Sequence, residues 1–236
     1  MSKLIVANLK MNLNYEEAKQ YKEALKLNYK EDLVVCPSYI YLDLMKSDNY
    51  SLGSQNGYYI DHGAYTGEIS YMQLNSIGVE YSIIGHSERR HIFEESDDLV
   101  AKKLDNCIKH NITPIVCVGE TIEEKNSGRT FEAVGRQLRN SLSDIKLDNI
   151  IIAYEPVWAI GSNQIPSKTE IEEIHIYIKK ILKDIYNIDG KVLYGGSVNL
   201  QNAKDIISIN GVDGLLIGTA SLNPSNLIDI IASTKM

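Results

Sequence analysis

The sequence predicts an α/β protein built as a single (β/α)₈ barrel, with eight parallel strands and an outer ring of helices. Eight short apolar or β-branched runs recur along the 236 residues, and an amphipathic segment follows each of them. Within each run the apolar residues are nearly continuous, as expected for parallel strands covered on both faces. No linker or low-complexity stretch interrupts the series, so we expect one domain over Met1–Met236.

The ends of these predicted strands indicate where an active site is expected. In such barrels the active site lies on loops that follow the carboxyl ends of the strands. Polar residues at those ends are therefore the first candidates for function. The expected strands are Leu4–Asn8, Leu33–Cys36, Tyr50–Ser54, Tyr81–Gly85, Thr113–Val118, Ile150–Glu155, Val192–Gly195 and Gly214–Gly218.

Apolar residues at helical spacing predict helices between the strands. The clearest patterns cover Tyr15–Leu27, Asp97–His110 and Lys168–Ile185. Ser167 and Glu170 have the spacing of a capping box at the start of the third helix. The residues that we expect as N-caps are Asn14, Ser96, Ser167 and Asn223.

Composition and charge narrow the classes of function. The chain is 44% hydrophobic with a net charge of −7, which argues against a general nucleic-acid or membrane-surface role. The N-terminus enters the strand-like Lys3–Asn8 without a signal-peptide pattern, and no apolar run approaches the roughly 20 residues of a membrane span. Cys36, Cys107 and Cys117 form no CxxC pair, which favours reduced thiols in the cytoplasm and disfavours structural zinc.

The first strand ends in Asn8-Leu9-Lys10-Met11-Asn12. A lysine just past a strand is commonly a solvated loop charge. Lys10 could instead supply a compact cation to a phosphate or to a developing enolate. Asn8 and Asn12 favour the second interpretation, because side-chain amides commonly orient a working ammonium.

The fourth strand ends in the segment Gly85-His86-Ser87-Glu88-Arg89-Arg90. A helical turn after His86 would present amides that disfavour imidazolium, and a neutral imidazole can donate to a carbonyl oxygen. The alternative for Glu88, and the interpretation we favour for Arg89 and Arg90, is a surface ion-pair cluster. The remaining histidines are expected to be structural or on the surface: His62, His91, His110 and His175.

Glu155 follows an apolar strand, where desolvation would raise the pKa of its carboxyl toward the range of a general base. The alternative is a carboxylate that merely pairs with Lys10 or an arginine. The segment Pro156–Gly161 then places the chain's one tryptophan beside small residues, a composition that suits a lid. Further along, Tyr194–Ser197 and Gly218–Ser221 end strands seven and eight, where barrels commonly bind phosphate on exposed amides.

Together these segments closely resemble the triosephosphate isomerase family over the whole chain. The resemblance implies the TIM-barrel fold and interconversion of dihydroxyacetone phosphate and D-glyceraldehyde 3-phosphate, through an enediolate, in glycolysis and gluconeogenesis. No metal or other cofactor is required by that reaction. The stretches that carry the resemblance are Asn8–Asn12, Gly85–Arg90, Cys117–Thr121, Ala153–Gly161 and Tyr194–Ser197.

The resemblance also implies residue roles. Glu155 would move the proton between carbons, His86 would polarise the carbonyl as a neutral electrophile, and Lys10 would stabilise charge. Asn8 would help to hold the substrate, and Glu88 would make a polar contact near Lys10. The amides expected to bind phosphate are those of Gly161, Ser197, Gly218 and Thr219. Two further residues of the motifs, Ser87 and Cys117, are expected to support the catalytic set.

The segment His62–Glu68 resembles the family's protruding third loop, which docks into a neighbouring subunit. This implies a homodimer in which Thr66 approaches the partner's Asn8 and the partner's Lys10. The alternative is a glycine-rich surface loop.

Three positions depart from the family pattern. The lid tip reads Gly161-Ser162-Asn163-Gln164 in place of Gly-Thr-Gly-Lys, Pro166 stands where alanine is common, and Gly218-Thr219 replaces Gly-Gly. The alternatives left open are another phosphate-binding barrel and a non-catalytic binding barrel. A decayed barrel would have lost part of the Lys–His–Glu set, whereas this chain keeps all three residues.

Overall fold

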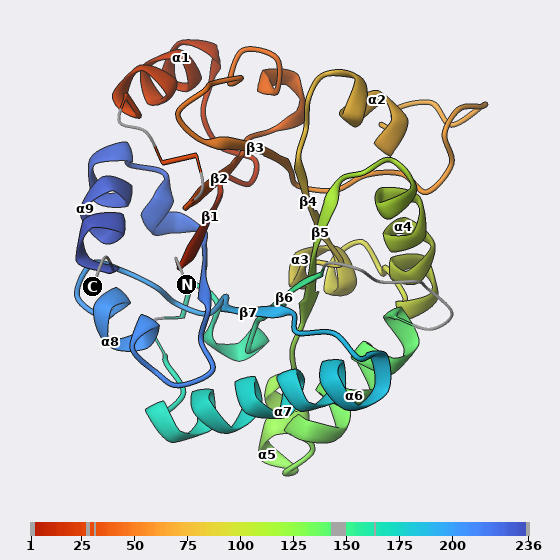
Figure 1. Cartoon of the computed structure of the whole chain (residues 1–236), viewed down its shortest axis with the longest axis vertical. Coiled ribbons are helices and arrows are strands. Elements are labelled where there is room, and N and C mark those ends of the chain that lie inside the picture. The colour runs from red at the N-terminus through yellow and green to blue at the C-terminus, as the bar shows by residue number, and fades with distance from the viewer. Residues whose placement is uncertain (1–2, 27–28, 31, 143–149, 163, 235–236) are drawn as a thin grey trace.

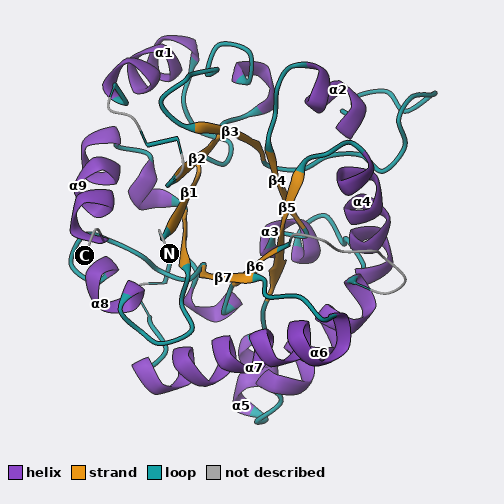
Figure 2. Cartoon of the chain, in the orientation of Figure 1, coloured by secondary structure: helices purple, strands orange, loops and turns teal. Residues whose placement is uncertain are grey.

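The computed structural model of the chain describes residues 3–26, 29–30, 32–142, 150–162 and 164–234. Within these residues, eight parallel strands pair in sequence order, and the first pairs with the eighth to close a barrel (Figure 1). Figure 2 shows the strands as an inner ring with the helices outside it. The predicted (β/α)₈ barrel is therefore confirmed.

The strand bounds agree with the sequence prediction to within one residue at either end. Four residues that were expected to end strands are instead the first residues after them: Gly85, Glu155, Gly195 and Gly218. Each therefore lies at the mouth of the barrel. The strands are β1 Leu4–Asn8, β2 Leu33–Cys36, β3 Ser51–Ser54, β4 Tyr81–Ile84, β5 Thr113–Val118, β6 Ile151–Tyr154, β7 Lys191–Tyr194 and β8 Gly214–Ile217.

A helix or a short 3₁₀ turn follows each strand along the chain. The α-helices are α1 Tyr15–Ala24, α2 Tyr71–Ser76, α3 Ser87–His91, α4 Asp97–Lys109, α5 Ile122–Asn126, α6 Thr130–Ser141, α7 Lys168–Tyr186, α8 Ala203–Ile207 and α9 Pro224–Thr234. Three short 3₁₀ turns are η1 Tyr39–Tyr41, η2 Val157–Ala159 and η3 Thr219–Ser221. The helix expected over Tyr15–Leu27 ends at Ala24, and Leu27 lies outside the described residues.

Side-chain caps explain where the predicted helices begin. Ser96 accepts the N–H of Leu99, and Ser167 forms the expected capping box with Glu170. Asn14 forms a similar box at α1, and Asn223 accepts N–H groups of α9. The four expected N-caps are confirmed.

The continuous apolar strands are explained by burial on both faces. In β1, Leu4 and Val6 lie in a cluster with residues of other strands, whereas Ile5 and Ala7 belong to the larger cluster between the strands and the helices. Both clusters consist of apolar side chains. β1 therefore lacks the alternation of apolar and polar residues that is typical of a strand with one exposed face.

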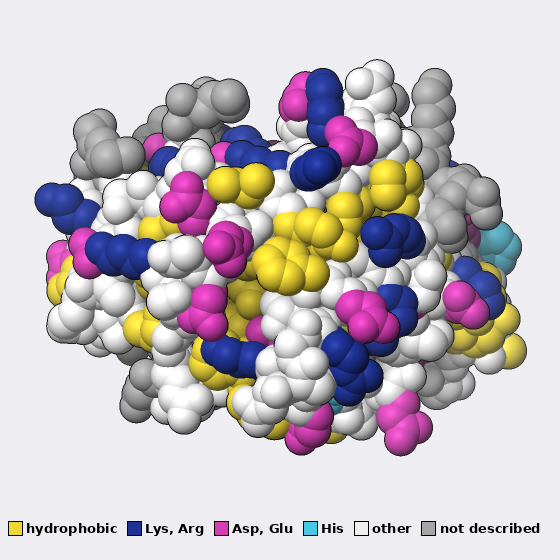
Figure 3. Space-filling model, turned by 90° about the horizontal axis from the view of Figure 1, so that it is seen from below, with side chains coloured by type: hydrophobic (Ala, Val, Ile, Leu, Met, Phe, Trp, Pro, Cys, Tyr) yellow, Lys and Arg dark blue, Asp and Glu magenta, His cyan; other side chains and the backbone are white. Residues whose placement is uncertain are grey.

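Both signs of charge are mixed on the face that contains α5 and α7, with hydrophobic side chains between them (Figure 3). Such a mixed surface lacks the single-sign field that attracts polyanions. Among the residues placed by the structure, no helix has the length and apolar character needed to cross a bilayer.

Candidate active site

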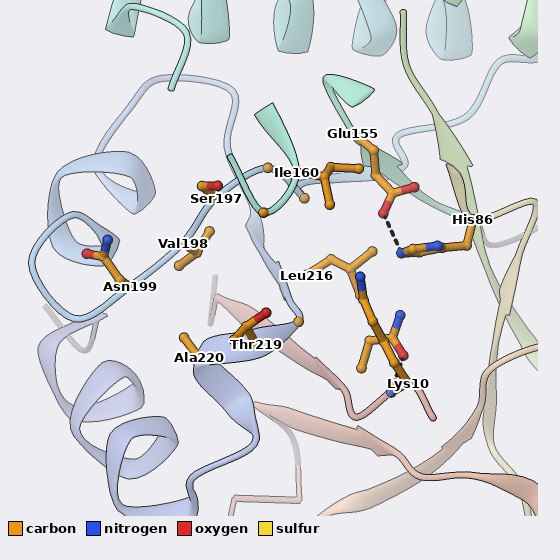
Figure 4. A pocket seen from close by; sticks show the side chains of 15 residues that line it. Lys10, His86, Glu155, Ile160, Ser197, Val198, Asn199, Leu216, Thr219 and Ala220 are labelled. Atoms are coloured by element: carbon orange, nitrogen blue, oxygen red, sulfur yellow. Dashed lines mark hydrogen bonds and ion pairs between the residues drawn. The ribbon is translucent and has the colours of Figure 1, made fainter. Parts of the chain in front are cut away.

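A hollow of about 280 Å³ opens at the carboxyl ends of the strands. The loops after β1, β4, β6, β7 and β8 contribute its lining, as the strand-end rule anticipates (Figure 4). The residues around it are Asn8, Lys10, His86, Glu155, Ile160, Gly161, Gly195, Gly196, Ser197, Val198, Asn199, Leu216, Gly218, Thr219 and Ala220. The structure thus brings the expected catalytic and substrate-binding residues to one cavity.

Lys10 is held in a left-handed backbone conformation, with φ of 51°. A non-glycine residue in that region costs about 1–3 kcal/mol, so the surrounding structure must enforce it. Asn8 Oδ1 accepts the Lys10 N–H at 3.1 Å, and the Lys10 carbonyl accepts from Ser38 Oγ at 3.0 Å and Gln55 Nε2 at 2.8 Å. These bonds fix the loop and direct the side chain toward the cavity.

Sequence reasoning missed Ser38 and Gln55, although both follow the ends of neighbouring strands. It also expected the side-chain amides of Asn8 and Asn12 to orient the Lys10 ammonium, which the structure does not show. Asn8 bonds the Lys10 backbone, and Asn12 Nδ2 donates to the carbonyl before Lys10 at 2.8 Å. Both amides therefore hold the loop backbone and not the ammonium.

The Lys10 ammonium is paired with Glu88, with Nζ 2.6 Å from Oε1, so the contact implied by the resemblance is present. Its side chain passes close to Gly218, where an added Cβ would lie 3.2 Å from the Lys10 Cε atom. A larger residue at position 218 would crowd the lysine stem. The Glu88 side chain is 41% exposed, so this ion pair lies at the open side of the cavity.

The side chains of His86 and Glu155 both line the cavity and point toward each other (Figure 4). His86 Nε2 lies 3.0 Å from Glu155 Oε1, and His86 Nδ1 accepts the Glu88 N–H at 3.2 Å. Because Nδ1 is an acceptor, the neutral ring carries its proton on Nε2 and donates it to Glu155. The second carboxylate oxygen accepts the Ser87 N–H at 2.9 Å. Glu155 is therefore paired with His86, and among the residues that the structure describes neither Lys10 nor an arginine forms an ion pair with it.

The pairing reverses the pKa directions expected for these two residues. Burial raises the pKa of Glu155, but the charge and hydrogen bond of His86, with the Ser87 N–H and the Cys117 thiol, lower it further, so the net pKa falls. Burial lowers the pKa of His86, and the Glu155 carboxylate more than reverses this, so the net pKa rises. The sequence had predicted the opposite directions, from desolvation for Glu155 and from the amides of a helical turn for His86, because it did not show that the two groups touch.

Close backbone packing explains the glycine after β5. An added Cβ at Gly119 would lie 1.7 Å from the Glu155 carbonyl oxygen. The Glu155 N–H donates to the Val118 carbonyl at 2.8 Å, which draws the two loops together. Gly119 therefore permits the approach that positions Glu155.

Glu120 anchors the start of the lid and was not singled out from the sequence. The carboxylate is buried and accepts from Trp158 Nε1 at 2.7 Å and from the Tyr154 hydroxyl at 3.0 Å. Burial raises its pKa despite these hydrogen bonds. The Lys125 ammonium lies 3.4 Å from the centre of the Trp158 ring. An acidic residue two positions after an apolar strand was the signal that could have identified it.

Glycine and hydroxyl residues line the end of the cavity away from His86 and Glu155. Gly161 has a positive φ of 66°, and Ser197 Oγ donates to the Ala159 carbonyl at 2.6 Å, which ties the loop after β7 to the lid. Thr219 begins η3 beside Gly218. This arrangement offers backbone N–H groups to an anion.

Known proteins match the chain over nearly all of its length. Residues 3–234 match the family model described as triosephosphate isomerase. The chain belongs to the triosephosphate isomerase family. Relatives of that name from Aquifex aeolicus, Alkaliphilus oremlandii and Thermodesulfovibrio yellowstonii are 41%, 39% and 40% identical to it. The alignments cover 99%, 97% and 97% of this chain and 100%, 98% and 98% of the relatives.

The triosephosphate isomerase motif Gly85–Arg90 contains one arginine that is more buried than expected. The Arg90 side chain is 9% exposed, pairs with Asp97 at 2.7 Å and donates to the Gly85 carbonyl at 2.8 Å. The surface assignment was wrong for Arg90, because its guanidinium binds backbone carbonyls at the ends of β4 and β5. Arg89 pairs with Glu95 and is partly exposed.

Proposed function

We propose that this chain interconverts dihydroxyacetone phosphate and D-glyceraldehyde 3-phosphate through an enediolate, with Glu155, His86 and Lys10 as its catalytic residues. One observation carries the proposal: an ammonium, an imidazole and a buried carboxylate line one cavity whose far end is rich in glycine. The match of residues 3–234 to the triosephosphate isomerase family supports the same reaction.

Glu155 is the base that takes a proton from one carbon and returns it to the neighbouring carbon. To reach a substrate, its carboxylate must leave the His86 ring and the Ser87 N–H that lower its pKa. Burial then remains without those stabilising contacts, so the pKa rises and the carboxylate becomes a stronger base. Substrate binding thereby makes Glu155 a stronger base than it is in the free protein.

His86 serves the two substrate oxygens. Its Nδ1 is occupied by the Glu88 N–H, so Nε2–H faces the cavity and donates to the carbonyl oxygen as negative charge develops. Release of Glu155 removes the carboxylate that favours imidazolium, which leaves a neutral donor. Lys10 supplies the cation next to the same oxygens.

The phosphate end holds the substrate and keeps water out. Amides of the lid and of the loops after β7 and β8 bind the dianion, namely those of Gly161, Ser197, Gly218 and Thr219. Closure of the lid excludes water, which protects an enediolate that would otherwise expel phosphate. Proton transfer between carbons needs no cofactor.

We also infer that the chain is a single-domain enzyme of the cytoplasm that works as a homodimer. The exposed segment His62–Glu68 supports the dimer, with Thr66 directed toward the partner's Asn8 and the partner's Lys10. Large apolar side chains elsewhere on the surface support it as well, since Met11 is 94% exposed and Phe93 61% exposed. Buried, unpaired Cys36, Cys107 and Cys117 accord with a reducing compartment.

Glu155→Gln tests the proposed base. The amide keeps the shape of the side chain but cannot accept the proton, so we expect kcat to fall by about 10²–10⁴-fold in a coupled assay with glyceraldehyde 3-phosphate. Thermal unfolding and binding of 2-phosphoglycolate serve as controls for an intact fold and an intact phosphate end. Turnover close to that of the natural sequence would refute the assignment.

A further inference from the structure

Thr219 places a hydroxyl at the end of the cavity away from Glu155. It is the first residue of η3 and lines the hollow together with Ser197 and Gly218. Figure 4 shows its side chain directed into the space between Ser197 and Lys10. The side chain is exposed to solvent, so a bound anion could reach it directly.

The neighbouring hydroxyls already have partners. Ser197 Oγ donates to the Ala159 carbonyl at 2.6 Å, and Ser221 Oγ lies 2.7 Å from the Gly218 carbonyl. Thr219 Oγ1 has no hydrogen-bond partner among the described residues, so its proton is available to a ligand. Among the hydroxyl side chains that the structure describes around this cavity, Thr219 is the free donor.

The backbone that carries this hydroxyl is fixed. The Ser221 N–H donates to the Gly218 carbonyl at 2.9 Å, and the Leu222 N–H donates to the Thr219 carbonyl at 3.2 Å. A β-branched residue also has few χ1 rotamers. Little conformational entropy is therefore lost when the hydroxyl binds an anion.

The charges that line the cavity favour an additional uncharged hydrogen-bond donor for a phosphate dianion. Lys10 is the cation that lines the cavity, and its ammonium is already shared with Glu88. A phosphate dianion therefore relies on uncharged donors, and a hydrogen bond to an ionised acceptor is stronger than one between neutral groups. A glycine at position 219 would offer an amide alone.

We propose that the Thr219 hydroxyl donates a hydrogen bond to a phosphate oxygen of the substrate, in addition to the amides of the same loop. The proposal rests on the proposed function and adds a side-chain donor that strengthens the preference for phosphorylated substrates. Removing it should weaken recognition of the phosphate more than the chemistry at the carbons.

Thr219→Val removes the hydroxyl and keeps the branched shape. We expect kcat/KM for glyceraldehyde 3-phosphate to fall about tenfold relative to kcat/KM for unphosphorylated D-glyceraldehyde, as for loss of one hydrogen bond to a charged group. Calorimetry should show a similar loss of affinity for 2-phosphoglycolate. Thr219→Ser should recover most of both, because it restores the donor. Thr169→Val, at an exposed threonine in the first turn of α7, is the matched control and should change neither.

Two results would overturn the proposal: a Thr219→Val enzyme within twofold of the natural sequence on the phosphorylated substrate, or an equal loss on both substrates. A natural protein that isomerises neither substrate would contradict the proposed function instead. Even then, the calorimetric comparison of Thr219→Val with Thr219→Ser would decide whether the hydroxyl binds phosphate.

Discussion

Tyr194 buries a hydroxyl that has no hydrogen-bond partner among the described residues. The ring lies at the end of β7, with its centroid 6.4 Å from that of Tyr154 and 6.3 Å from that of His175. The resemblance implies that such a hydroxyl binds a backbone N–H at the far hinge of the lid. Pro166 occupies that hinge position in this chain and has no N–H to donate. We therefore predict that this chain lacks that latch.

Tyr194→Phe should therefore cost little. We expect kcat/KM to change by less than about fivefold, and the free energy of unfolding to hold or rise, because a buried hydroxyl without a partner is itself unfavourable. Tyr154→Phe is the matched control: its hydroxyl bonds Glu120 at 3.0 Å, so its removal should destabilise the fold by about 0.5–1.5 kcal/mol. A hundredfold loss of activity in Tyr194→Phe would show that the hydroxyl has another partner when the lid closes.

At this scale the sequence located Lys10, His86 and Glu155 but not the contacts among them. A polar residue directly after an apolar strand is visible locally, and the barrel brings such positions together. The pairing of His86 with Glu155, and the clamp of Gln55 on Lys10, depend on side-chain directions across separate loops. A local sequence pattern contains no information on these directions. The contact between His86 and Glu155 was therefore not predicted, and neither were the directions of their pKa shifts.

At the scale of elements, α7 packs against the barrel through a fully buried histidine. The His175 Nδ1–H donates to the Ile171 carbonyl at 2.8 Å, and the edge of the ring meets Tyr154 at 5.7 Å between centroids. Burial lowers the pKa of His175 to about 4, against smaller opposing contributions from backbone carbonyls and Asp213. The periodicity of α7 was visible in the sequence, but its apolar stripe did not reveal that a histidine belongs to the buried face.

This histidine should make folding sensitive to acid. Its pKa is about 6.5 in an unfolded chain, so its contribution is complete above that pH and is lost as the pH falls toward 4, where the unfolded chain binds the proton more readily. Between pH 7 and 4 the loss amounts to about 3 kcal/mol. His175→Asn should be less stable at pH 7 but should lose about 3 kcal/mol less over this range. Denaturant unfolding at fixed protein concentration measures both chains, and parallel pH profiles would contradict the assignment.

At the scale of the whole molecule, the segment between β3 and α2 extends away from the barrel (Figure 1). Its residues from His62 to Glu68 are exposed, and the rings of Tyr58 and Tyr65 are in contact within it, tilted by 46° with their centroids 4.9 Å apart. Asp61 fixes its base to the end of α4, accepting from Asn106 Nδ2 and Lys109 Nζ at 2.9 Å each. A projecting loop that is anchored so firmly is suited to dock into a second subunit. Sequence alone gave this loop only through resemblance, because a glycine-rich stretch has no periodicity to read.

The proposed dimer predicts that this loop controls both assembly and activity. Deletion of Tyr65–Glu68 should give a weakly active monomer at micromolar concentration, because the neighbouring active site loses the support of Thr66 for the Lys10 loop. Thr66→Arg should act in the same direction by placing a bulky charge in the interface, where an unpaired buried charge is strongly unfavourable. Thr169→Arg makes the same change at an exposed threonine of α7 and should leave mass and activity unaltered.

Light scattering measures the mass of each variant, and the coupled assay measures its activity at the same concentration. A fully active monomer of the natural sequence would contradict the dimer, and a Thr66→Arg dimer with normal turnover would remove Thr66 from the interface.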